Sequence, residues 1–108
     1  MTDKWFDQDF WDDNFDDFDD QDLQEILEEA TADLAILIHG LRSDDHVVIA
    51  KNAHKIVSVC GNFGYLQCAT LAANVEQQVK EGRLADEANK LLIEMVERVT
   101  SELRNKGA

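Results

Sequence analysis

The chain has 108 residues, enough for one compact domain with a hydrophobic core and too few for two. Its 23 Asp and Glu outnumber its 10 Lys and Arg, and the formal net charge of -13 argues against nucleic acid or an anionic membrane as a partner. Zero Pro, five Gly and a hydrophobic share of 44% favour helices over a turn-rich β fold. We therefore expect an all-α domain.

The N-terminal residues differ from the rest in charge and in aromatic content. Residues 1–22 hold ten Asp and one Lys, a charge of -9, whereas residues 23–108 carry only -4. Six of the eight aromatic residues recur here at helical spacings: Trp5, Phe6, Phe10, Trp11, Phe15 and Phe18. Residues 1–21 are therefore either a short amphipathic helix laid across one end of the domain, or a mobile segment that folds onto a partner.

From residue 22 to residue 106, the apolar residues form four seams at helical spacing. The seams span residues 23–41, 49–63, 68–79 and 88–103. Short polar or glycine-containing connections separate them, which favours an antiparallel up-down-up-down four-helix bundle. The predicted organisation is a bundle over residues 22–106, preceded by an acidic, aromatic segment or short capping helix over residues 1–21.

No apolar run is long enough to span a bilayer, and the start MTDKWFDQDFW lacks the basic and apolar regions of a signal peptide. We therefore expect a cytoplasmic protein. Cys60 and Cys68 form neither a CxxC pair nor a disulfide framework, and both fall on buried seams, so they are interpreted as small core residues. With no HExxH or Glu-x-x-His pattern and no glycine-rich phosphate loop, we expect no metal, no cofactor and no enzyme active site.

Helical spacing sets His54 apart from the other two histidines. At about 100° per residue it lies roughly 140° from the core-facing seam of its helix, so its side chain should be exposed. His39 and His46 fall near helix ends and are interpreted as surface residues. Around His54 the helix presents an open face on which another protein could bring a reactive group to the ring. The residues one or two turns away are Ala50, Lys51, Val57, Ser58 and Gly61.

Residues 53–64, AHKIVSVCGNFG, resemble the signature of histidine-containing phosphotransfer (Hpt) domains, Ala-His-x-Leu-Lys-Gly-Ser-Ala-x-x-Leu-Gly. His54 matches the phosphorylated histidine of that signature. Its apolar, small and glycine positions are matched by Ile56, Cys60, Phe63 and Gly64. The order of the predicted helices also agrees with the family over about residues 23–104.

Two positions depart from this signature. Val57 stands where the family normally has a Lys that steadies the phosphoryl group, and Ser58 stands where it has Gly. Lys51 and Lys55 are the candidate substitutes for the missing positive charge. Glu76 falls where the family often places Glu or Gln, and it either orients the imidazole by a hydrogen bond or is a solvated helix carboxylate.

The resemblance implies a stand-alone phosphorelay intermediate of two-component signal transduction. A receiver domain carrying an aspartyl phosphate would dock over His54, the neutral Nε2 would attack phosphorus, and the phosphohistidine would pass the group to another receiver. The implied partners are response-regulator receivers and a hybrid sensor histidine kinase, acting in trans on a monomer. The implied apolar docking surface consists of Val47, Ala50, Val57, Gly61 and Tyr65.

Two alternatives remain open from the sequence. Val57 motivates a degenerate Hpt domain that docks on a receiver or a kinase without efficient transfer. The aromatic N-terminal segment motivates an acidic helical adaptor in which His54 has no role.

Overall fold

A computed structural model describes residues 4–106, which form five helices and no strand. The helices are α1 (Gln8–Phe15), α2 (Asp20–Leu41), α3 (His46–Asn62), α4 (Leu66–Lys80) and α5 (Asp86–Lys106). The expectation of an all-α domain is therefore confirmed. Among these helices, none is both long enough and apolar enough to cross a membrane.

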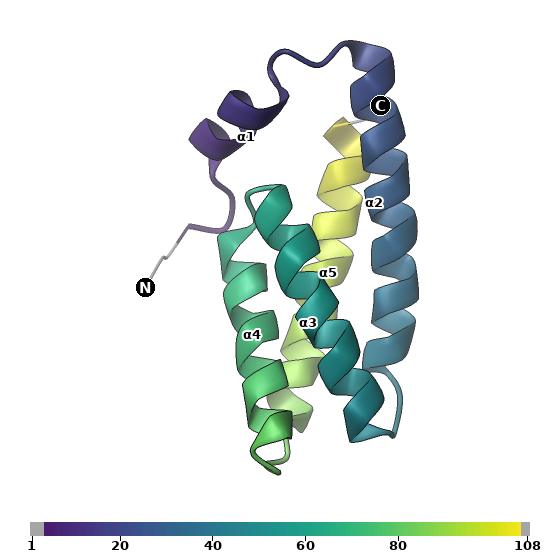
Figure 1. Ribbon diagram of the computed structural model, residues 1–108, viewed down its shortest axis with the longest axis vertical. Coiled ribbons are helices and arrows are strands. Elements are labelled where there is room, and N and C mark those ends of the chain that lie inside the picture. The colour runs from purple at the N-terminus through teal and green to yellow at the C-terminus, as the bar shows by residue number, and fades with distance from the viewer. Residues whose placement is uncertain (1–3, 107–108) are drawn as a thin grey trace.

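The four long helices, α2 to α5, lie side by side, and each runs in the direction opposite to the one before it (Figure 1). α2 packs against α3 and α5, and α4 packs against the same two helices, so the four enclose one core. That core is built from the apolar seams, because side chains at helical spacing share one face and are removed from water together. Its completely buried members include Leu34, Ala53, Ile56, Cys60, Cys68, Ala72, Val75, Leu92, Val96, Val99 and Leu103.

Aspartates are the N-cap residues of the first three helices. The side chain of Asp7 accepts a hydrogen bond from the backbone N–H of Phe10, and Asp19 and Asp45 do the same at the starts of α2 and α3. Such a cap satisfies an N–H group that has no partner inside the helix, and it stabilises a helix by about 1 kcal/mol. Because Asp19 is the cap, α2 begins at Asp20, two residues before position 22, where the sequence placed the start of the bundle.

The N-terminal segment packs against one end of the bundle, beside the turn between α3 and α4 (Figure 1). Its backbone is joined to that turn by a hydrogen bond of 2.9 Å from the N–H of Asp7 to the carbonyl oxygen of Gly64. Trp11 is buried, and the ring of Phe15 stacks on the ring of Phe63 with centroids 5.4 Å apart. Of the two arrangements considered for this segment, residues 4–21 have the first, a short helix with aromatic side chains packed on the bundle, and residues 1–3 lie outside the described residues.

Side chains of α5 hold the same segment from a second direction. The indole N–H of Trp5 donates to the carboxylate of Glu102 at 3.0 Å, and the guanidinium of Arg98 lies 4.0 Å from the centroid of the Trp5 ring. The ammonium of Lys106 lies 4.4 Å from the centroid of Phe6. A cation over an aromatic face contributes about 0.5–1 kcal/mol at exposed sites. The segment is therefore tied both to the α3–α4 turn and to the end of α5.

Gly64 lies in the turn between α3 and α4, where the N-terminal segment contacts the bundle. Its φ is +84°, which strains any residue with a Cβ, and a Cβ there would lie 3.1 Å from the carbonyl oxygen of Asp7. We expect Gly64→Ala to lower the free energy of unfolding by about 1–2 kcal/mol, as measured by urea denaturation.

Gly61→Ala is the matched control for this substitution. Gly61 lies inside α3, and a Cβ there would meet nothing within 4 Å. The alanine should therefore leave stability unchanged or raise it by up to about 1 kcal/mol through its higher helix propensity. Equal losses of stability in the two variants would contradict the role given to the left-handed turn.

Candidate functional site

His54 lies in the middle of α3, on the side that faces away from the core. Its side chain is 70% exposed, whereas the neighbouring Ala53 and Ile56 are completely buried. The exposure predicted from helical spacing is therefore confirmed. His39 and His46, near the end of α2 and at the start of α3, are also exposed, as predicted.

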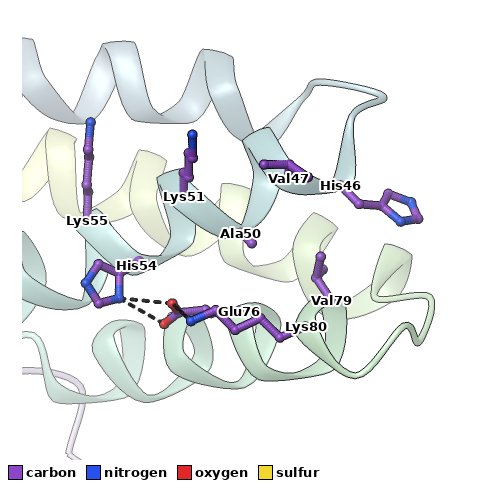
Figure 2. A pocket seen from close by; sticks show the side chains of 9 residues that line it. All are labelled: His46, Val47, Ala50, Lys51, His54, Lys55, Glu76, Val79 and Lys80. Carbon is purple, nitrogen blue, oxygen red and sulfur yellow. Dashed lines mark hydrogen bonds and ion pairs between the residues drawn. The ribbon is translucent and has the colours of Figure 1, made fainter.

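Glu76 of α4 meets the His54 ring from the neighbouring helix (Figure 2). The Nδ1 atom of the ring lies 3.1 Å from Oε1 and 3.0 Å from Oε2 of the carboxylate. An ionised carboxylate can only accept hydrogen bonds, so this contact favours the tautomer with the proton on Nδ1. The lone pair is then on Nε2, the nitrogen on the opposite side of the ring from Glu76.

Lys80 is the second basic group on the same carboxylate. Its Nζ lies 2.8 Å from Oε2 of Glu76, one helical turn away on α4. This hydrogen bond from Lys80 is the main reason that the pKa of Glu76 is lowered; burial of the carboxylate opposes the effect, and the contact with His54 adds to it. The carboxylate therefore stays ionised at neutral pH. Lys80 is not among the site residues predicted from the sequence, although the i, i+4 spacing of Glu76 and Lys80 is typical of an ion pair on a helix.

The two lysines that the sequence singled out lie on another side of the ring. Lys51 and Lys55 extend toward α2, whereas His54 reaches toward α4 (Figure 2). Their positions follow from the helix, since residues 51 and 55 lie roughly 60° and 100° around its axis from residue 54. Both lysines nevertheless line the same groove as His54, and their role as substitutes for the missing positive charge stays a prediction.

Two open grooves flank His54, which forms the ridge between them. The groove between α3 and α4 has a volume of about 540 Å³ and is lined by His46, Val47, Ala50, Lys51, His54, Lys55, Glu76, Val79 and Lys80. The groove between α2 and α3 has a volume of about 420 Å³ and is lined by Asp33, Ile36, Leu37, His54, Lys55, Ser58 and Val59. Apolar side chains reach the surface in both, with Val47 61% exposed and Ile36 68% exposed.

Four of the residues expected on the docking surface lie along α3 around His54. Val47 and Ala50 line the α3–α4 groove, Val47 as an exposed side chain and Ala50 as a buried one. Val57 and Gly61 are partly exposed further along the helix. Ser58 is exposed in the α2–α3 groove.

Tyr65 is not on the surface, so its prediction as a docking residue is wrong. Its relative exposure is 0%, and the rings of Trp5 and Phe6 lie 5.7 and 5.0 Å from its own. The chain turns at Gly64, so residue 65 does not continue the exposed face of α3, and the aromatic residues of the N-terminal segment cover it. Burial, followed by the negative charge of Glu102, raises the pKa of Tyr65.

Cys60 and Cys68 are free and completely buried, as the sequence predicted. Their sulfur atoms lie 3.2 Å apart, between α3 and α4. The thiol–thiol hydrogen bond, together with burial, raises the pKa of Cys60. Both groups are therefore core side chains and stand apart from the His54 surface. Within residues 4–106, no three His, Cys, Asp or Glu side chains are arranged to hold a metal ion.

Comparison with protein families gives a match that contains this whole site. The family model of the Hpt domain matches residues 21–104, well over half of the chain, from the start of α2 to near the end of α5. Searches of curated proteins and of solved structures gave no significant match. Hpt domains are the histidine phosphotransfer modules of phosphorelays and are not kinases, which agrees with the exposed histidine found here. The chain belongs to the Hpt domain family.

Proposed function

We propose that this protein accepts a phosphoryl group from the aspartyl phosphate of a receiver domain onto Nε2 of His54 and then passes it to a second receiver. The observation that carries the proposal is the exposed imidazole whose Nδ1 is held by Glu76 of the adjacent helix. In this arrangement Nε2 has a free lone pair and an approach path from outside the protein. In-line displacement at phosphorus depends mainly on such positioning.

The proposed transfer requires few other groups from this chain. As the Nε2–P bond forms, the P–O bond to the receiver's aspartate breaks and the aspartate leaves as a carboxylate. The proton stays on Nδ1, so the phosphorylated ring carries a positive charge. The carboxylate of Glu76 accepts the hydrogen bond from Nδ1 before and after transfer, and its negative charge stabilises the ring cation. Transfer to the second receiver reverses these steps.

The receiver is proposed to dock over the ridge formed by His54 and its two grooves. Apolar side chains are available there, with Val47 on one side of the ring and Ile36 on the other. We propose that the chain acts in trans as a monomer, that a hybrid sensor histidine kinase supplies the first receiver, and that a response regulator supplies the second.

The test is a transfer assay with a receiver that carries radiolabelled aspartyl phosphate. We expect label to move to this protein, to be lost in acid and to survive in base, which is the stability of a phosphohistidine and the opposite of an aspartyl phosphate in base. Addition of a second, unlabelled receiver should then remove the label. No label on the folded protein, tested against a broad panel of receivers, would contradict the proposal.

One observation favours a second candidate, a docking module that binds receivers without efficient transfer. Val57 lies one turn beyond His54, where the family signature has a lysine, and valine cannot offset the charge of a phosphoryl group.

Val57→Lys separates the two candidates. Position 57 is partly exposed, so a lysine can cover the same surface with its methylene stem and place its ammonium beside the ring. For an efficient transfer protein we expect the rate to rise by no more than about threefold, because most of the charge neutralisation comes from the receiver. Val57→Met, which lengthens the side chain without charge, is the control. A gain of about tenfold or more in Val57→Lys alone would favour the docking module.

A further inference from the structure

Glu76 touches two basic side chains, and the two contacts have opposite consequences for His54. Oε2 of Glu76 lies 3.0 Å from Nδ1 of His54 and 2.8 Å from Nζ of Lys80. A carboxylate beside an imidazole favours the protonated ring. A protonated ring has no lone pair on Nε2 and cannot attack phosphorus. The contact that orients His54 would therefore, acting alone, reduce the fraction of the ring that can react.

Lys80 acts against this effect through the same carboxylate. Its ammonium offsets the negative charge of Glu76 and repels a second positive charge on the nearby ring. We propose that Lys80 is a positioning residue that lets Glu76 fix the His54 ring while keeping that ring neutral and nucleophilic. The proposal rests on phosphoryl transfer at His54, as proposed above.

The other charged groups around the ring do not share this position. From α3, His46, Lys51 and Lys55 line the groove beside His54, and from α2, Asp33 lines the other groove. Among residues 4–106, the ion pairs of Glu76 are those with His54 and Lys80. The side chain of Glu76 is 15% exposed, whereas those of His54 and Lys80 are 70% and 61% exposed, so solvent partly screens both contacts. The ion pair with Lys80 also lowers the pKa of Glu76 and so keeps the carboxylate charged.

The experiment measures the pH dependence of transfer from one phosphorylated receiver to three forms of the full chain. These are the wild type, Lys80→Met and Lys80→Arg. Lys80→Met leaves the carboxylate facing the ring alone, so the ring stays protonated to a higher pH. We expect the acid limb of the profile to move upward by about half a pH unit, which is a loss of about threefold at pH 6 and almost none at pH 8.5. Lys80→Arg should restore the wild-type profile, because it keeps the charge.

A double variant isolates the charge mechanism from docking. In Lys80→Met combined with Glu76→Gln, the carboxylate that contacts Nδ1 of the ring is gone, so the upward shift caused by the Lys80 substitution should disappear. Nitrogen NMR of the ring in the unphosphorylated protein, at pH 6.5, should show more of the protonated form in Lys80→Met than in the wild type.

Several outcomes would overturn the assignment of Lys80. A loss of rate that is uniform across pH in Lys80→Met would show a contact with the receiver instead, and an unchanged profile would show no role. In both cases label on His54 would leave the proposed function intact. If the wild type accepted no label at any pH, the proposed function would fail, and the NMR comparison would still decide whether Lys80 controls the protonation of the ring.

Discussion

Replacing His54 by glutamine is expected to lower phosphoryl transfer to this protein by about a thousandfold or more, to the background of the assay. The amide nitrogen of glutamine has no free lone pair, so it cannot form a bond to phosphorus. The fold should be retained, since the His54 side chain is 70% exposed and its hydrogen bond is to Glu76. We expect the free energy of unfolding to change by less than about 0.5 kcal/mol, as measured by urea denaturation.

The other two histidines supply the controls for this experiment. His39→Gln replaces an exposed residue near the end of α2, away from both grooves, and should keep transfer within about twofold of the wild type, whereas His46→Gln should keep label on His54 even if docking is weakened. His46 is the more demanding control, because it lines the same groove as His54. If label persisted in His54→Gln and vanished in His46→Gln, the phosphorylated residue would be His46 and not His54.

Trp11→Ala is expected to produce the largest loss of stability, about 3 kcal/mol. Trp11 is 9% exposed, and its ring lies 4.6 Å from that of Phe15 and 6.2 Å from that of Phe63. Alanine would leave a cavity between the N-terminal segment and the end of the bundle. In a domain of this size, such a loss lowers the melting temperature by on the order of 15 °C, which thermal denaturation followed by circular dichroism measures directly.

Phe18→Ala is the control on the same segment. Phe18 is 40% exposed, and its ring contact is with Phe15, so its removal should lower stability by less than about 1 kcal/mol. Equal melting of Trp11→Ala and the wild type would show that the segment does not stabilise the bundle. Because Trp11 packs at the α3–α4 turn, the folded variant should keep transfer at His54. The burial of its indole also leaves less aromatic surface for the adaptor hypothesis.

The positions of the four long helices and the exposure of His54 could be predicted from the sequence. Apolar side chains at a spacing near 3.6 residues gather on one face of a helix, so the seams predict α2 to α5 wherever those faces pack together. The direction of His54 relative to its seam depends only on the number of residues between them. Both properties belong to single helices, and for this reason both could be predicted.

Contacts between distant parts of the chain could not be obtained in this way. Tyr65 is buried because Gly64 turns the chain and because Trp5 and Phe6 cover the ring. Lys80 belongs to the site because α4 packs beside α3 at a register that sets Glu76 against the histidine. Neither the covering of one residue by another segment nor the register between two helices is contained in the spacing along one helix.

Because of where the tryptophans lie, fluorescence and circular dichroism report on two different parts of the protein. Trp5 and Trp11, the two tryptophans of the chain, both lie in the N-terminal segment, next to charged groups of α5. Indole fluorescence therefore reports whether this segment is seated on the bundle, whereas far-ultraviolet circular dichroism reports mainly on α2 to α5, which contain most of the helical residues. The two melting curves coincide if the segment and the bundle unfold as one cooperative unit, and the fluorescence transition comes first if the segment detaches by itself.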